Sequence, residues 1–160
     1  MNKAYLLIGG NLGERQQNLE KAWALLTLSC GSIVKSSSIY ETDAWGNTEQ
    51  PAFLNQAVEL ETEFTAKKLM RWILKTEKNM GRVRNDKYGP RNIDIDILLF
   101  NDEQYNYSFL KIPHPELHNR RFALVPLAEI APETNHPVFN KTISTLLKEC
   151  NDKLSVRKFN

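Results

Sequence analysis

The hydrophobic and polar positions divide the chain into short extended segments and longer helical ones. An unbroken apolar run from Ala4 to Ile8 ends at a pair of glycines, as expected of a buried strand. Strand-like patterns return at 33–40, where the middle is rich in serine, and at 53–60, where the two faces alternate. A fourth apolar segment follows at 93–100. We therefore predict four strands.

Apolar residues at helical spacing predict helices between these strands. Leucine, alanine and tryptophan recur every three or four residues over 14–29, which indicates an amphipathic helix. Thr65 has the position of an N-cap for a second helix that ends near Gly81. Two shorter helices are predicted at 122–130 and 142–148.

The predicted order is β-α-β-β-α-β followed by C-terminal helices, which is the ferredoxin-like plan of an α+β protein. It implies an antiparallel sheet with two helices on one face. The other face would be left to active-site loops. With 160 residues the chain has a suitable length for one domain over 1–160.

The stretch IDIDILLF, at 93–100, places two carboxylates in one of the most hydrophobic runs. Successive strand residues face opposite ways, so the apolar residues should line the buried face: Ile93, Ile95, Ile97 and Leu99. Asp94 and Asp96 would share the other face, with Cα atoms about 6.6 Å apart. Like charges this close resist ionisation unless a cation lies between them. The pair is either an ordinary exposed pair or a Mg²⁺ site.

The loop before this strand is basic. Residues 75–91 contain six basic and two acidic residues, although the whole chain carries only +2. Arg82, Arg84 and Arg91 suit phosphate, because a guanidinium donates two parallel hydrogen bonds and does not deprotonate. We expect 81–90 to be an exposed, mobile loop, in which removal of Arg82 hardly changes stability. A solvated basic loop is the alternative.

Other candidate residues are a histidine, three aromatic residues and an asparagine. His114 lies between two prolines, and is either a surface side chain or a donor to phosphate. Phe53 and Asn55 share the strand face that is not the core face, where a ring and an amide would suit a flat heterocycle. Any single aromatic residue, such as Trp45 or Phe122, is more often part of a core. The glycine-rich GGNLGER, at 9–15, is neither a Walker A motif nor a dinucleotide fingerprint.

Composition excludes several classes of protein. The small net charge argues against bulk nucleic-acid binding. No segment has the roughly 18 apolar residues of a membrane span, and the apolar run at the N-terminus is too short for a signal peptide. Cys30 and Cys150 lack metal-site spacing, and we interpret them as reduced thiols. We therefore expect a cytoplasmic protein that does not bind membranes.

Five motifs in order give the chain a family resemblance: GRVR at 81–84, GPR at 89–91, DIDILLF at 94–100, PHPELHNRRF at 113–122 and PLAEIAPE at 126–133. Together they resemble 6-hydroxymethyl-7,8-dihydropterin pyrophosphokinase, of folate biosynthesis. This family transfers the β,γ-pyrophosphoryl group of ATP to the pterin hydroxymethyl group and releases AMP. The resemblance implies small-molecule substrates, no nucleic-acid partner and, as we expect, a monomer.

The resemblance also implies roles for residues. Asp94 and Asp96 match aspartates that hold two Mg²⁺ ions and, with Arg82 and Arg91, form the catalytic set. The matches to ATP-binding residues are Glu77, Arg82, Arg91, His114 and Arg120. The matches to the pterin pocket are Thr42, Ala44, Trp45, Gly46, Phe53, Asn55 and Phe122, with the two phenylalanines sandwiching the ring.

Two other functions remain open from the residues alone. Ferredoxin-like sheets often bind RNA, but no strand here has the alternating aromatic pattern of RNA-binding sheets. A metal-dependent phosphohydrolase could use the same pair of aspartates. Release of phosphate or pyrophosphate from ATP without a pterin would favour that enzyme.

Overall fold

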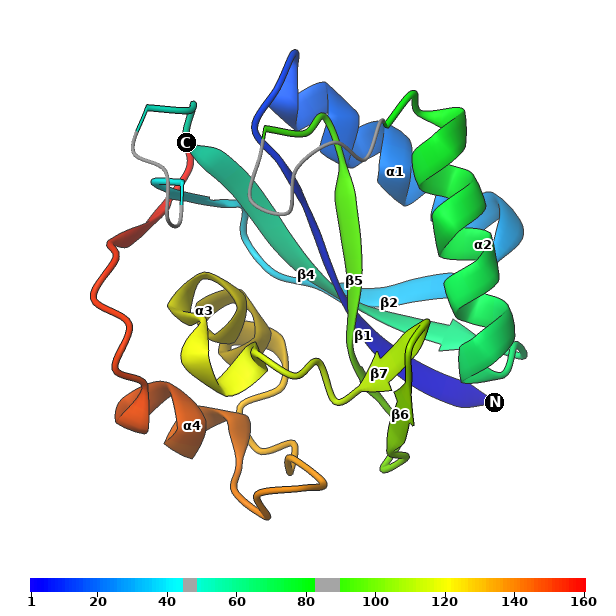
Figure 1. Cartoon of the computed structure of the whole chain (residues 1–160), viewed down its shortest axis with the longest axis vertical. Coiled ribbons are helices and arrows are strands. Elements are labelled where there is room, and N and C mark those ends of the chain that lie inside the picture. Colours follow the sequence, from blue (N-terminus) through cyan, green and yellow to red (C-terminus); the bar gives the residue numbers. More distant parts are fainter. Residues whose placement is uncertain (45–48, 83–89) are drawn as a thin grey trace.

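The computed structural model describes residues 1–44, 49–82 and 90–160. An antiparallel sheet forms its centre, in the order β5-β1-β4-β3-β8, and β2 also pairs with β4 (Figure 1). The strands of this sheet are β1 (Asn2–Gly10), β2 (Ser32–Ser36), β3 (Tyr40–Thr42), β4 (Phe53–Thr62), β5 (Asp94–Phe100) and β8 (Val156–Lys158). A separate hairpin is formed by β6 (Tyr105–Tyr107) and β7 (Leu110–Ile112).

The helices fall at the predicted places. They are α1 (Arg15–Ser29), α2 (Ala66–Asn79), α3 (Arg121–Ile130) and α4 (Ile143–Glu149), and a short 3-10 turn, η1, covers Leu117–Asn119. The Thr65 side chain caps α2 by accepting a hydrogen bond from the Lys68 N–H, as the sequence predicted. Within the described residues, no helix is long and apolar enough to cross a membrane.

The prediction of an antiparallel α+β sheet is confirmed, but the strand order is more elaborate than predicted. The segment expected to be one strand over 33–40 is two strands, β2 and β3, which pair with successive parts of β4. The C-terminal strand β8 adds to the free edge of β3 and was not predicted. It covers backbone groups that would otherwise be exposed at that edge.

Two hydrophobic cores lie on the two faces of the sheet. Helices α1 and α2 pack together on one face, and α3 with α4 lies on the other (Figure 1). Ile93, Ile95 and Ile97 belong to the α1/α2 core, as predicted. The prediction for Leu99 is wrong, because it belongs with Leu98 to the α3 core. A register shift between β1 and β5 inserts one extra residue there and reverses the alternation.

The prediction that loops alone would cover the second face is wrong, because α3 packs on part of it. Tyr5 and Leu7 of β1, and Ala57 of β4, belong to the core beneath it. Two residues further along the same strand faces, Gly9 and Asn55 lie beyond that core. This end of the face is where the predicted site residues gather.

Candidate functional site

The two aspartates of β5 share the strand face predicted for them. Each is partly exposed, while the isoleucines on either side are buried. Burial of its carboxyl group, followed by the nearby charge of Asp94, raises the pKa of Asp96. Arg120 acts in the opposite direction, so its positive charge lies within electrostatic reach. The Asp96 carboxylate is therefore costly to ionise in the metal-free site, and a bound cation would offset that cost.

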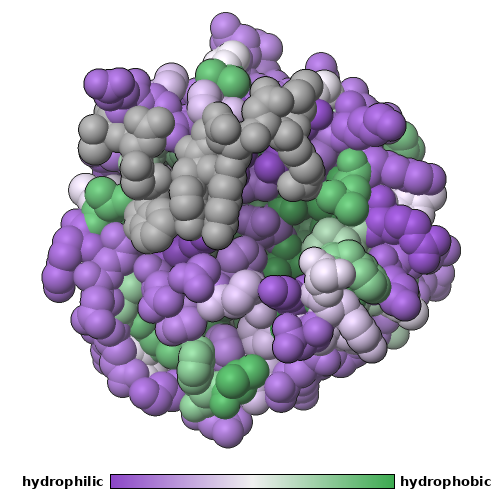
Figure 2. Space-filling view, viewed as in Figure 1, coloured by the Kyte–Doolittle hydropathy of each residue, from purple (hydrophilic) through white to green (hydrophobic). Residues whose placement is uncertain are grey.

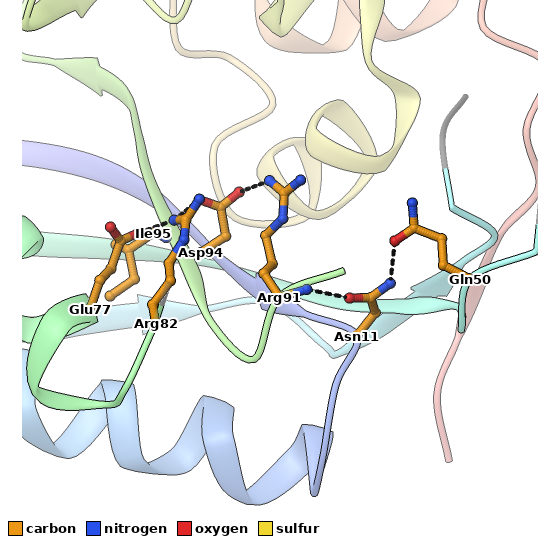
Figure 3. Close-up of polar contacts among 7 residues, drawn as sticks. All are labelled: Asn11, Gln50, Glu77, Arg82, Arg91, Asp94 and Ile95. Carbon is orange, nitrogen blue, oxygen red and sulfur yellow. Dashed lines mark hydrogen bonds and ion pairs between the residues drawn. The ribbon is translucent and has the colours of Figure 1, made fainter. Parts of the chain in front are cut away.

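Two arginines neutralise Asp94 in this structure. One nitrogen, Nη1 of Arg82, lies 2.7 Å from Oδ1 of Asp94 and 2.8 Å from Oε2 of Glu77. Nη1 of Arg91 lies 3.3 Å from Oδ2 of the same aspartate (Figure 3). The Arg82 side chain is only 9% exposed. The prediction that Arg82 is an exposed loop residue is therefore wrong, because it is drawn down onto two carboxylates.

Glu77 lies beneath this arrangement at the end of α2. Its side chain is 3% exposed, and its Oε2 also accepts a hydrogen bond from the backbone N–H of Ile95 at 2.8 Å. One oxygen of Glu77 thus connects α2 to Arg82 and to the start of β5. A carboxylate buried in this way fixes the position of its neighbours more directly than it reaches a ligand.

Gly9 separates the aspartates from the predicted pterin residues. In the sheet register Gly9 is opposite Asp94 on β5 and opposite Asn55 on β4. A Cβ atom at Gly9 would lie 2.0 Å from Oδ1 of Asn55, so the Asn55 amide occupies the space above the glycine. Within the described residues, that amide makes no side-chain hydrogen bond, and its donor and acceptor are available to a ligand.

The pterin-side residues lie along β3 and β4. Thr42 is opposite Phe53 in the register, and its buried Oγ1 has no hydrogen-bond partner among the described residues. Ala44, two residues further along the chain, is also buried. A buried hydroxyl without a partner is costly unless a bound group satisfies it. Trp45 and Gly46, also predicted here, lie outside the described residues.

An arginine covers each phenylalanine of the predicted sandwich. The guanidinium carbon of Arg91 lies 5.6 Å from the ring centre of Phe53, and that of Arg120 lies 5.7 Å from the ring centre of Phe122. Both distances are in the range of cation–π contacts. These two pairs of aromatic and phosphate-binding candidates are therefore neighbours.

His114 lies within electrostatic reach of Arg120 and Asp94. Its Nδ1 accepts a hydrogen bond from the Glu116 N–H at 3.1 Å, which leaves Nε2 as the donor in the neutral ring. Burial, and then the charge of Arg120, lowers the pKa of His114 to about 4. The imidazole is therefore neutral at pH 7 and acts through an N–H group without carrying charge.

The site fits a divalent cation held by few protein ligands. No group of three or more His, Cys, Asp or Glu side chains comes together in the described part of the chain. Mg²⁺ commonly takes one or two carboxylates and completes its octahedron with water and substrate phosphate. Asp94 and Asp96 match that donor set, whereas a site closed by protein ligands alone, as for structural zinc, does not fit them.

The surface around the site is polar. Figure 2 shows a mostly hydrophilic face with a hollow, and hydrophobic residues at the bottom of that hollow. This combination of an apolar floor and a polar rim is common in small-molecule sites.

The sequence reasoning missed Asn11 and Gln50. Asn11 is 2% exposed and connects Gln50 to the backbone of Arg91 (Figure 3). The sequence offers one signal for Asn11, the GGN after the first strand, which matches no nucleotide-binding motif.

Comparison with known proteins gives a consistent result. The family model described as 7,8-dihydro-6-hydroxymethylpterin-pyrophosphokinase matches residues 5–132. The 2-amino-4-hydroxy-6-hydroxymethyldihydropteridine pyrophosphokinase of Bacillus subtilis is 44% identical over 130 residues, which cover 81% of this chain and 78% of that protein. The protein of the same name from Aquifex aeolicus is 40% identical over 149 residues, covering 93% and 92%.

Solved structures support the fold. A crystal structure of Plasmodium falciparum HPPK-DHPS with pterin and p-hydroxybenzoate superposes with a TM-score of 0.74 at 20% identity. The alignment covers 92% of this chain but only 41% of that longer one. At this level of identity the likeness concerns the fold alone.

Proposed function

Because the chain belongs to the 7,8-dihydro-6-hydroxymethylpterin-pyrophosphokinase family, we infer that it transfers a pyrophosphoryl group to a hydroxymethyldihydropterin in folate biosynthesis. We propose further that the donor is ATP, that Mg²⁺ is required and that AMP is released. The observation that carries this proposal is the single face on which Asp94, Gly9 and Asn55 lie side by side in three neighbouring strands. Strands lie about 4.8 Å apart, so the outer two Cα atoms are separated by roughly 10 Å.

Positively charged and neutral donors would bind the triphosphate. Arg82 and Arg91 both contact Asp94, so their guanidinium groups already lie where phosphate oxygens beside a carboxylate-bound cation would be. The neutral His114 would donate from Nε2, and Arg120 would add charge near Asp96. Glu77 would position Arg82 instead of contacting the nucleotide, since its carboxylate is buried beneath that arginine.

Asp94 and Asp96 would hold two Mg²⁺ ions, which neutralise the charge of the triphosphate when bound. The protein's own part is then to orient and to supply positive charge. Phosphoryl transfer through a loose transition state depends mainly on these two contributions. The two arginines supply charge from the protein side, without a covalent intermediate.

The pterin would lie over β4, between the rings of Phe53 and Phe122. Its edge would meet the Asn55 amide, which has both a donor and an acceptor available, and the Thr42 hydroxyl. The loop that includes Ala44, Trp45 and Gly46 would complete the pocket. In this position the hydroxymethyl group can point along the sheet face toward the aspartate side.

Product analysis tests this function directly. The protein is incubated with ATP, Mg²⁺ and 6-hydroxymethyl-7,8-dihydropterin, and nucleotides are separated. AMP as the main nucleotide product supports the proposal, whereas ADP rejects pyrophosphoryl transfer. Release of phosphate or pyrophosphate from ATP without a pterin would instead indicate a phosphohydrolase.

The remaining proposals concern the whole chain. We describe the four central strands and two helices as a ferredoxin-like unit to which β8 and the β6–β7 hairpin are added. We also propose that the chain acts as a cytoplasmic monomer, with no nucleic-acid partner. Light scattering tests whether the protein is a monomer. Salt-dependent binding of RNA in EDTA would contradict the absence of a nucleic-acid partner.

A further inference from the structure

We propose that Asn11 is a positioning residue that fixes the pterin side and the phosphate side of the site relative to each other. The inference rests on the proposed function, since it assigns Arg91 to phosphate and the start of β4 to the pterin. It concerns a residue outside both sets, in the turn between β1 and α1.

The Asn11 side chain uses its acceptor and donors on two different segments. Its Oδ1 accepts a hydrogen bond from the backbone N–H of Arg91 at 2.9 Å. Its Nδ2 donates to Oε1 of Gln50 and to the carbonyl oxygen of Pro51, both at 2.9 Å. With 2% of the residue exposed, water has little access to replace these partners. Truncation would leave the partly buried partner groups on Gln50, Pro51 and Arg91 without these hydrogen bonds.

The backbone of the same turn reinforces one of these contacts. The N–H groups of Asn11 and Leu12 both donate to the carbonyl oxygen of Arg91, at 2.8 and 3.2 Å. A Cβ atom at Gly10 would lie 2.3 Å from the carbonyl oxygen of Asn92, so only glycine allows this approach. The stretch Gly9-Gly10-Asn11 therefore touches Asn55, the Arg91–Asn92 backbone and Gln50–Pro51 in turn.

Both segments lead directly to site residues. The side chain of Arg91 contacts Asp94 and lies over the ring of Phe53. Phe53 itself begins β4 two residues after Pro51, and the Asn55 amide follows on the same face. A shift at Asn11 would therefore move protein groups that bind each of the two substrates. Misplacement of such groups by about 1 Å can lower the reaction rate on the order of a hundredfold.

Asparagine is the side chain that these partners require. It offers one acceptor and two donor hydrogens on a short stem. Aspartate would keep the acceptor for the Arg91 N–H. It would, however, place a negative charge against Oε1 of Gln50 and the carbonyl oxygen of Pro51, and this charge would also repel ATP. For this reason neutral variants give the cleaner test.

The test measures binding of each substrate separately in Asn11→Ala, Gln50→Met and the double variant. Binding of α,β-methylene-ATP with Mg²⁺, and of 6-hydroxymethyl-7,8-dihydropterin, is followed by titration. We expect Asn11→Ala to weaken both ligands at least about fivefold, and Gln50→Met to weaken only the pterin to that extent. The double variant should bind the pterin no worse than Asn11→Ala alone, because both changes remove the same hydrogen bond.

Two further variants keep the outcomes distinct. Gln50→Glu retains the acceptor oxygen and should bind the pterin within about threefold of the original chain. Gln17→Ala removes an exposed amide from α1 and should leave both affinities unchanged. If Asn11→Ala does not fold, the contrast between Gln50→Met and Gln50→Glu still decides, and equal pterin affinities in these two variants overturn the proposal.

Failure of this inference is separable from failure of the proposed function. If the unmodified protein binds neither ligand, or makes no AMP, the proposed function is wrong. If it does both, but the losses in Asn11→Ala and Gln50→Met simply add, or Asn11→Ala affects only one ligand, then Asn11 does not connect the two sides.

Discussion

Replacement of Arg82 by methionine should destabilise the protein, even though the sequence suggested an exposed loop residue. Methionine keeps most of the length of the side chain but removes the nitrogen that lies 2.8 Å from Glu77 and 2.7 Å from Asp94. A hydrogen bond to a charged partner contributes about 1.5–3 kcal/mol. The contribution from Asp94 is discounted, because its side chain is 25% exposed and it keeps Arg91.

The cost then comes mainly from Glu77. Its side chain is 3% exposed, so the variant leaves a buried carboxylate with the Ile95 N–H but without Arg82. Breaking one partner of a buried ion pair costs about 3–5 kcal/mol when nothing compensates. With relaxation at this edge of the sheet we expect a loss of about 2–3 kcal/mol.

Urea unfolding of the metal-free protein at pH 7 measures this loss. The double variant Arg82→Met with Glu77→Gln should recover at least about 1 kcal/mol, since a neutral amide replaces the uncompensated charge. Lys78→Ala, at an exposed position on α2 next to Glu77, serves as the control. Its free energy of unfolding should stay within about 0.5 kcal/mol of the original value. Arg82→Met within that same margin would show that the carboxylates do not depend on the arginine, and the reasoning would be wrong.

In single-turnover assays we expect the transfer rate of Arg82→Met to fall about 10³-fold, with ATP affinity changed by less than about tenfold.

Three other outcomes are expected. Asp96→Asn should abolish turnover yet stabilise the metal-free protein by at least about 1.4 kcal/mol, because the raised pKa of Asp96 makes the folded state lose stability as pH rises; a gain that does not grow from pH 4 to pH 8 would contradict this. His136 is 3% exposed and its pKa is lowered to about 4, so stability should fall by up to about 3 kcal/mol as pH drops from 6.5 to 4, and less in His136→Asn. Gly9→Ala should weaken pterin binding at least about tenfold by displacing the Asn55 amide, while affinity for an ATP analogue stays within about threefold; unchanged titrations would place the pterin elsewhere.

The strand that carries the aspartates could be predicted because its signal is local. Alternation of Asp and Ile over 93–97 fixes two faces, and the structure agrees with both. The alternation fails only at Leu98 and Leu99, where a register shift depends on the pairing with β1. No periodicity within 93–100 contains that information, because a bulge is a property of two strands.

The environment of Arg82 and Asn11 could not be predicted for a related reason. Arg82 is buried because Glu77 and Asp94, five and twelve residues away, converge on one of its nitrogens. Asn11 bonds to residues 39, 40 and 80 positions away in the chain. Such contacts arise only after the sheet has formed, and the sequence shows one asparagine after two glycines.

The partial cover that α3 gives to its sheet face has an evolutionary consequence. On β4 a step of two residues separates Ala57, which packs under the helix, from Asn55, which faces the site. On this face of the sheet, selection for folding therefore acts on one half of each central strand, and selection for chemistry acts on the other half. A descendant of this chain can exchange Phe53, Asn55 or Asp94, and so come to accept a different molecule, without repacking either core.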